Sequence, residues 1–127
     1  MKVLVVDDDR TTRQLYGRWL AKAGYEVELA ANGRDGIALA GSWHPDGVLV
    51  DIILPDLSGI EVLARIKAST PGIPVVLCTW GFGPDVMDRA VAAGATRVLD
   101  KAGLKARHLV SEFDSAIAVA STNRAGT

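Results

Sequence analysis

Five side chains have the chemical types that a divalent cation and a phosphoryl group would need, and each follows an apolar run. They are three acids, a hydroxyl and an amine: Asp7, Asp8, Asp51, Thr79 and Lys101. Like charges that lie close together repel each other unless a cation intervenes, and an all-oxygen ligand set suits Mg²⁺, with Mn²⁺ as the alternative. A positive charge and a hydroxyl are groups that hold phosphoryl oxygens. The set therefore indicates metal-assisted phosphoryl chemistry, provided that the fold gathers the five side chains.

Apolar runs alternate with helical patterns along the chain, and this alternation predicts how the five side chains meet. We expect strands at 3–6, 25–30, 48–51, 73–78 and 96–99. We expect helices at 10–23, 34–42, 59–69, 84–94 and 104–121. Strands and helices that alternate in this way form a parallel sheet with right-handed crossovers, so that helices cover both faces. The predicted fold is α/β, a doubly wound five-stranded parallel sheet whose strands all open their carboxyl ends on the same side.

Local signals support several of these boundaries. Asp51 ends an apolar run, and the turn after it leads to Ser58 and Glu61, which have the spacing of a capping box. This spacing predicts a helix that begins one residue after Ser58, which leaves Asp51 at a junction between strand and loop. Asp9 can cap the first helix. The stretch 25–30 alternates apolar and polar residues, as an edge strand open to water on one side does.

The composition limits the class of protein. At 127 residues the chain is one domain, and we expect residues 1–121 to form it and residues 122–127 to be a flexible tail. The formal net charge of −1 gives no electrostatic reason to expect nucleic acid or an anionic membrane as a direct partner. Cys78 is the only cysteine, the start of the chain does not resemble a secretory leader, and no apolar run is long enough to span a bilayer. The expected location is therefore the cytoplasm.

The stretches VVDDD, DIILPDLSG, VVLCT and LDK, in this order and spacing, resemble the receiver domain of bacterial two-component response regulators. The resemblance covers essentially the whole chain. It implies the flavodoxin-like strand order 2-1-3-4-5, which places Asp7 and Asp8 beside Asp51. It also implies that Asp51 accepts a phosphoryl group, with Mg²⁺, from a phosphohistidine on a histidine kinase or histidine phosphotransfer protein of a phosphorelay. Such a protein is not an enzyme beyond promoting its own phosphorylation and dephosphorylation, and it signals through protein contacts.

The same resemblance assigns roles to individual residues. By the family pattern, Asp8 and Asp51 bind the metal directly, Asp7 binds it largely through water, and the main-chain carbonyl of Ile53 supplies a further ligand. The phosphoryl group would contact two other side chains, Thr79 and Lys101. Taken alone, Lys101 would be expected at the surface or paired with Asp100, which is the default for a single lysine.

The sequence departs from the family pattern near the output machinery. Trp80 stands where a small residue is usual, Val98 where an aromatic is frequent, and Ala102 where a proline usually follows the lysine. We expect no cis peptide bond at Ala102, because a cis bond without proline costs about 2.5 to 4 kcal/mol. The short, stiff side chain of Val98 cannot swing as an aromatic would. We therefore hypothesise that Trp80 replaces it as the moving part; the alternative is that Trp80 packs at the rim and slows donor entry.

Two positions that tune dephosphorylation in the family hold Ile53 and Gly81, whose side chains cannot orient a water, so we expect slow self-dephosphorylation.

Two other functions compete with the receiver interpretation. VLVVDDDRT also fits the signature of haloacid-dehalogenase-type phosphatases, with Asp7 as nucleophile and Asp9 as acid-base group. That family, however, needs a further acidic pair after its lysine, and nothing beyond Asp100 provides the one it needs. The second is a receiver-like interaction module that no longer uses phosphate. The sequence leaves open the cognate kinase, the downstream target, the oligomeric state, and whether the chain acts alone or was cut from a longer regulator.

Overall fold

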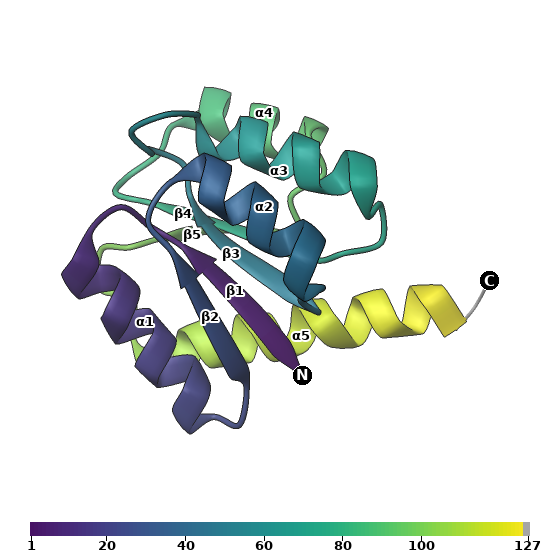
Figure 1. Ribbon diagram of the computed structural model, residues 1–127. Helices are drawn as coiled ribbons and strands as arrows, with labels where there is room; N and C mark the ends of the chain where they lie inside the picture. Colours follow the sequence, from purple (N-terminus) through teal and green to yellow (C-terminus); the bar gives the residue numbers. More distant parts are fainter. Residues whose placement is uncertain (126–127) are drawn as a thin grey trace.

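Five parallel strands form the centre of the protein. The computed structural model describes the backbone of residues 1–125 and the side chains of residues 1–120. The strands are β1 (Lys2–Val6), β2 (Glu26–Ala30), β3 (Gly47–Asp51), β4 (Val75–Thr79) and β5 (Arg97–Asp100). Their order is β2-β1-β3-β4-β5, and each neighbouring pair is parallel (Figure 1). The predicted fold and strand order are confirmed, and the carboxyl ends of β1 and β3 are adjacent.

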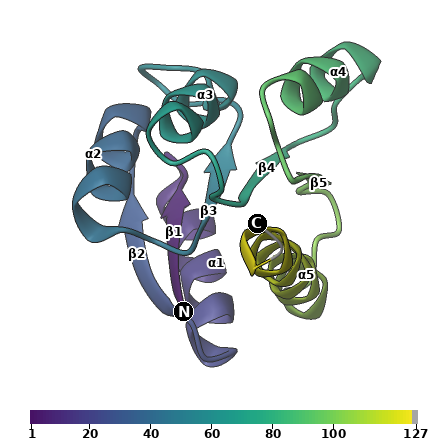
Figure 2. The same cartoon turned by 90° about the vertical axis from the view of Figure 1, so that its right-hand side faces the viewer.

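Five helices cover the two faces of this sheet. They are α1 (Arg10–Lys22), α2 (Gly33–Trp43), α3 (Gly59–Ser69), α4 (Pro84–Ala92) and α5 (Ala106–Ala125). Helices α1 and α5 lie on one side of the sheet and the other three on the opposite side (Figure 2). Successive strand residues point to opposite faces, so Val3 and Val5 enter the α1/α5 core while Leu4 and Val6 enter the other. Burial on both faces accounts for the continuous apolar runs of β1, β3 and β4.

The helix starts follow the capping signals of the sequence. The carboxylate of Asp9 accepts from the main-chain N–H of Thr12 at 2.9 Å and caps α1. The hydroxyl of Ser58 accepts from the N–H of Glu61 at 3.1 Å and caps α3. The carboxylate of Glu61 pairs with Arg65, one turn along the helix, at 3.1 Å. Both predicted starts are confirmed.

Several predicted boundaries shift by one to four residues. The fourth strand begins at Val75 and not at Ile73, because Pro74 has no N–H for the ladder and the N–H of Ile73 donates to Thr70 in the preceding turn. β2 begins at Glu26, one residue later than expected, and lies at the sheet edge as its alternation predicted. β5 is shifted by one residue toward Asp100.

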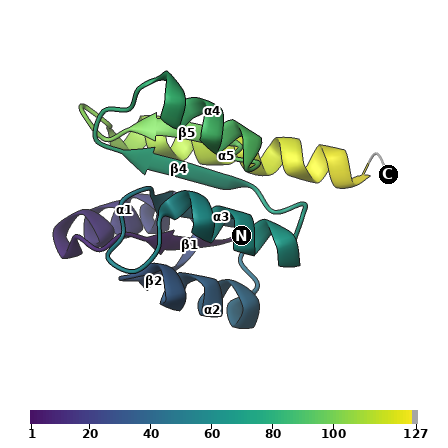
Figure 3. The ribbon, with the colours of Figure 1, turned by 90° about the horizontal axis from the view of Figure 1, so that it is seen from above.

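The last helix begins at Ala106 and continues to Ala125, past the expected end at Ser121. Its C-terminal turns project beyond the sheet (Figure 3). The expected tail of residues 122–127 therefore includes four helical residues, and residues 126–127 lie outside the described part of the chain. Within the described part, no helix combines the length and apolar character needed to cross a bilayer.

Candidate functional site

Asp51 lies at the carboxyl end of β3, where the chain turns into the loop that leads to α3. This loop is tight: the N–H of Gly59 donates to the carbonyl of Ile52 at 2.7 Å. A Cβ on Gly59 would lie 2.2 Å from the carbonyl oxygen of Asp51. Only glycine fits at this position, so the first residue of α3 fixes the backbone that carries Asp51.

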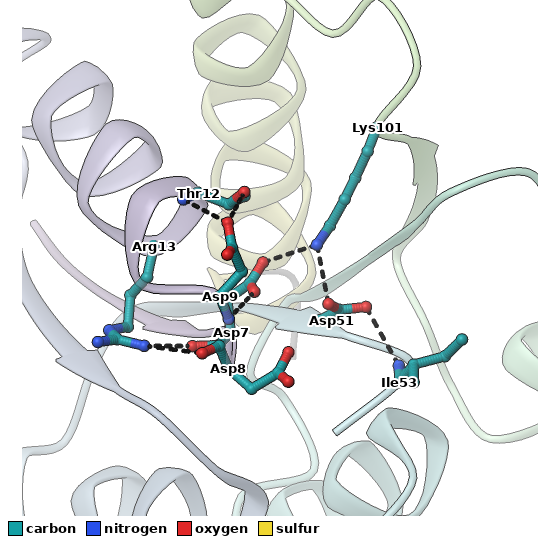
Figure 4. A network of polar contacts seen from close by, with 8 residues as sticks. All are labelled: Asp7, Asp8, Asp9, Thr12, Arg13, Asp51, Ile53 and Lys101. Carbon is teal, nitrogen blue, oxygen red and sulfur yellow. Dashed lines mark hydrogen bonds and ion pairs between the residues drawn. The ribbon is translucent and has the colours of Figure 1, made fainter. Parts of the chain in front are cut away.

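Two further acids lie beside Asp51, as the strand order predicted. Asp7 and Asp8 follow β1, which pairs with β3 up to Val6 and Val50. One carboxylate oxygen each of Asp7, Asp8 and Asp51 lies within 4.8 Å of the others. Asp7 and Asp51 are buried and Asp8 is exposed, so the group opens to solvent on the Asp8 side (Figure 4).

Lys101 reaches directly into this acidic group. Its Nζ donates to Asp7 Oδ2 and to Asp51 Oδ2, each at 2.8 Å (Figure 4). The residue is 5% exposed, so the default expectation of a surface lysine, or of a pair with Asp100, is wrong here. A lysine is buried at this depth only when its charge is compensated, and two carboxylates compensate it.

The charges of this site are unbalanced. Burial raises the pKa of the Asp7 carboxyl, although hydrogen bonds from Lys101 and from the N–H of Asp9 act in the opposite direction. Burial acts to lower the pKa of Lys101, but its hydrogen bonds to Asp51 and Asp7 outweigh this effect and the pKa rises. When all groups are ionised, three carboxylates against one ammonium leave a net charge of −2. An all-oxygen group with this excess charge fits a hard divalent cation such as Mg²⁺.

The sequence of the chain matches a known family. The family model described as the response regulator receiver domain matches residues 3–114. The chain belongs to this family.

Curated relatives of this receiver domain are longer proteins. Response regulator MprA of Mycolicibacterium vanbaalenii is 39% identical over 101 residues, which make up 80% of this chain and 44% of that protein. A cyclic di-GMP phosphodiesterase of Thermotoga maritima is 39% identical over 101 residues, which make up 80% of this chain and 27% of that protein. The chain spans less than half the length of these two relatives.

Solved structures show the same fold over nearly the whole chain. A CheY-like response regulator receiver domain protein from Methanospirillum hungatei superimposes with a TM-score of 0.91 at 27% identity, covering 96% of this chain and 97% of that one. Chemotaxis protein CheY4 of Vibrio cholerae gives a TM-score of 0.86 at 31% identity, covering 91% of this chain and 97% of that one.

Arg13 is a residue of this receiver domain that the sequence argument missed. Its Nη1 donates to the main-chain carbonyl of Asp7 at 2.8 Å and lies 3.5 Å from that of Asp8 (Figure 4). The N–H of Asp9 donates to Asp7 Oδ1 at 2.9 Å in the same turn. Side chains on a helix point back toward its N-terminus. A long cationic side chain in the first turns of α1 could therefore have been predicted to reach the residues before the helix. Arg13 therefore fixes the peptides that carry the acidic pair.

Asp56, in the loop after Asp51, is a second residue near the site that was not predicted from the sequence. Its two carboxylate oxygens accept from the N–H groups of Gly33 at 2.8 Å and Arg34 at 2.9 Å, in the first turn of α2. The main-chain donors of Arg34 and Gly33 hold the pKa of Asp56 below its ordinary value. This contact ties the loop after Asp51 to the N-terminus of α2.

The remaining predicted positions lie around the rim of the site. Thr79 is the buried last residue of β4, while Trp80 after it is 66% exposed and Ile53 is 72% exposed. The N–H of Ile53 donates to Asp51 Oδ1 at 3.1 Å. Cys78 is buried, and burial raises the pKa of its thiol, which agrees with an inert core cysteine. No peptide bond among the described residues is cis, as expected from Ala102.

Proposed function

We propose that the chain is a phosphoacceptor receiver of a two-component phosphorelay and that Asp51 is the residue phosphorylated. One observation carries the choice among the three acids. The Asp51 side chain both accepts from Lys101 at 2.8 Å and keeps 9% of its surface open to solvent, whereas that of Asp7 is 1% exposed. Asp8 is exposed, but the contacts of Lys101 are with Asp7 and Asp51. Asp51 thus combines access for a donor with a positive charge beside its reacting oxygen.

The chemistry is transfer of a phosphoryl group from nitrogen to oxygen. A carboxylate oxygen of Asp51 bonds to phosphorus as the P–N bond of the donor phosphohistidine breaks, and the electron pair of that bond passes to the imidazole. Lys101 offsets the negative charge on the transferred oxygens, and the hydroxyl of Thr79 donates a hydrogen bond to one of them. Preorganised charge of this kind is effective because it needs no reorganisation during the transfer.

The metal ligands would be the carboxylates of Asp8 and Asp51, the carbonyl of Ile53 and, through water, Asp7. Their oxygen donors and net negative charge support Mg²⁺, with Mn²⁺ as the alternative. The bound ion would neutralise charge on the phosphoryl oxygens. The partners are then a cytoplasmic histidine kinase or phosphotransfer protein as donor and a protein target downstream.

Acetyl phosphate with Mg²⁺ tests the site of phosphorylation. The acyl phosphate is trapped by reduction and mapped by mass spectrometry, and we expect the adduct on Asp51 alone. Asp51→Asn should abolish labelling and keep the fold, while Asp88→Asn, an exposed acid on α4, serves as the matched control and should label normally. An adduct on Asp7 or Asp8 in the unaltered protein would contradict the proposal.

The two competing functions make different predictions. The phosphatase alternative needs Asp9 as an acid-base group, but its carboxylate accepts from the N–H and the hydroxyl of Thr12, at 2.9 and 2.6 Å, as the cap of α1. A phosphate-independent module would not bind beryllofluoride, a mimic of the phosphoryl group. Saturable binding of beryllofluoride with Mg²⁺, lost in Asp51→Asn, supports the phosphoacceptor and excludes the module.

Trp80 is our candidate for the side chain that reports phosphorylation to the surface. It adjoins Thr79 and is largely exposed, whereas Val98 packs against the core on the α3 side. In a protein with Trp19 and Trp43 changed to Phe, beryllofluoride and Mg²⁺ should alter the emission of Trp80. Constant emission while the mimic binds would show that Trp80 is not the moving part.

A further inference from the structure

Asp100, the last residue of β5, joins two loops at the rim of the site. Its Oδ1 accepts from the N–H of Ala102 at 2.9 Å, in the loop after β5. The same oxygen accepts from the N–H of Gly81 at 3.2 Å, in the loop after β4. These donors, with Ala102 the stronger, hold the pKa of the Asp100 carboxyl below its ordinary value. The carboxylate therefore connects the segment that carries Thr79 with the segment that carries Lys101.

The loop after β4 contains two glycines that do little to hold it. Gly81 has a φ of +56°, and a Cβ built on Gly81 or on Gly83 would have no atom within 4 Å. These two glycines in open surroundings contribute neither packing nor stiffness to the loop. Its side next to β5 is fixed by two contacts: the N–H of Lys101 donates to the carbonyl of Thr79 at 2.8 Å, and Asp100 accepts from Gly81 two residues further on.

The donor on Ala102 exists because this position is not proline. A proline would have no N–H, and one of the two hydrogen bonds to Asp100 would be lost. In this chain a hydrogen bond from Ala102 to Asp100 therefore takes the place of the stiff proline ring. That bond orients the Asp100 carboxylate toward Gly81.

We propose that Asp100 is a positioning residue for phosphoryl transfer: it holds the loop after β4 so that Thr79 and Lys101, which lie on different strands, address the same phosphoryl group. The inference rests on the proposed function of Asp51. Lys101 is already anchored by two carboxylates at 2.8 Å, so the group that depends on Asp100 is the hydroxyl of Thr79. Asp100 acts through the backbone of the loop and does not touch the reacting atoms.

Two substitutions separate the hydrogen bonds from the charge. Asp100→Asn keeps a side-chain oxygen that can accept from both N–H groups, whereas Asp100→Ala removes it. In Asp100→Ala without ligand, hydrogen exchange at the amides of Gly81 and Ala102, measured by NMR, should be at least about threefold faster, as expected for loss of one exposed hydrogen bond. Beryllofluoride affinity with Mg²⁺ should fall by about the same factor. Asp100→Asn should restore both values, and the thermal midpoint should change little in either variant.

Other results would overturn the inference. Unchanged exchange in Asp100→Ala means that the carboxylate does not hold the loop. Faster exchange with unaltered beryllofluoride affinity means that the loop does not position Thr79. Tighter binding in both variants means that Asp100 acts only through its negative charge. Failure of the unaltered protein to bind beryllofluoride would instead refute the proposed function, and amide exchange would still decide whether Asp100 holds the loop.

Discussion

Replacing Asp8 with asparagine should stabilise the metal-free protein and remove its response to Mg²⁺. Asp8 is the acid of the site whose carboxylate is exposed, and the contacts of Lys101 are with Asp7 and Asp51. The substitution therefore removes one negative charge and leaves the two buried ion pairs in place. Asp51→Asn is a less direct test, because it also removes the negative charge of one ion-pair partner of Lys101.

The size of the effect follows from the separation of the charges. Oxygens of Asp8 and its two acidic neighbours lie within 4.8 Å of one another. At that distance a pair of unit charges repels by about 0.9 kcal/mol in water and about 3.5 kcal/mol at an effective dielectric constant of 20. Lys101 offsets part of the repulsion, and the exposure of Asp8 favours the lower limit. We therefore expect Asp8→Asn to raise the free energy of unfolding by about 1 to 2 kcal/mol, or the midpoint by roughly 3 to 8 °C.

Thermal unfolding followed by circular dichroism, with EDTA and then with saturating Mg²⁺, measures both parts of the prediction. Mg²⁺ at a hundredfold excess over its Kd should stabilise the unaltered protein by about 2.7 kcal/mol, so the order of the two midpoints should reverse. Asp88→Asn removes the same charge from an exposed part of α4 and should leave the midpoint within about 0.5 kcal/mol of the unaltered value. An unchanged or lower midpoint for Asp8→Asn in EDTA would refute the account of the site as a cluster of repelling carboxylates.

Three other substitutions test separate parts of the structure. Lys101→Met should lower the free energy of unfolding in EDTA by about 3 kcal/mol or more, because the two carboxylate partners of Lys101 stay buried without a cation. In chemical denaturation, Mg²⁺ should restore part of this free energy. An unaffected midpoint would show that the ammonium is dispensable. Gly59→Ala should lower the free energy of unfolding by more than about 2 kcal/mol, because the new Cβ would lie 2.2 Å from the carbonyl oxygen of Asp51. The control Gly41→Ala, in an open part of α2, should raise it by about 0.5 to 1 kcal/mol. Equal effects of the two substitutions would contradict the close packing at Gly59. Ile53→Asn should accelerate loss of phosphate from the isotope-labelled protein, because an amide can orient a water and the exposed apolar side chain cannot; an equal or slower rate would count against this explanation.

The sequence was sufficient to predict which elements form and where their ends meet. Buried strands have continuous apolar runs, so β1, β3 and β4 could be found from the order of the residues, and the parallel arrangement puts their terminal acids and hydroxyl at one edge of the sheet. The strand order that makes the ends of β1 and β3 neighbours came from the resemblance to the family. Caps at Asp9 and Ser58 were predictable because each needs only a bond to a residue three positions away. Local chemistry of this kind is visible in the order of the residues.

Contacts between distant segments were not predictable in the same way. Nothing near Lys101 in the sequence indicates that its stem is buried, because the acids that compensate its charge come from other strands. Asp56 lies in the turn after β3, and the two N–H groups that donate to it lie 22 and 23 positions earlier in the sequence. The end of α5 was misplaced because its last turns extend past the sheet, where no apolar pattern is required.

The two ion pairs of Lys101 also link completion of the acidic site to the order in which the chain is synthesised. They join residues 94 and 50 positions apart in the sequence. A ribosome therefore releases both acids long before the lysine that compensates them, and contacts this distant in sequence form late because a long loop has to close first. Until β5 docks, a partly folded chain has the acidic group without its internal cation. Under the function proposed above, the chain would become a competent phosphoryl acceptor only once β5 has docked and the fold is complete.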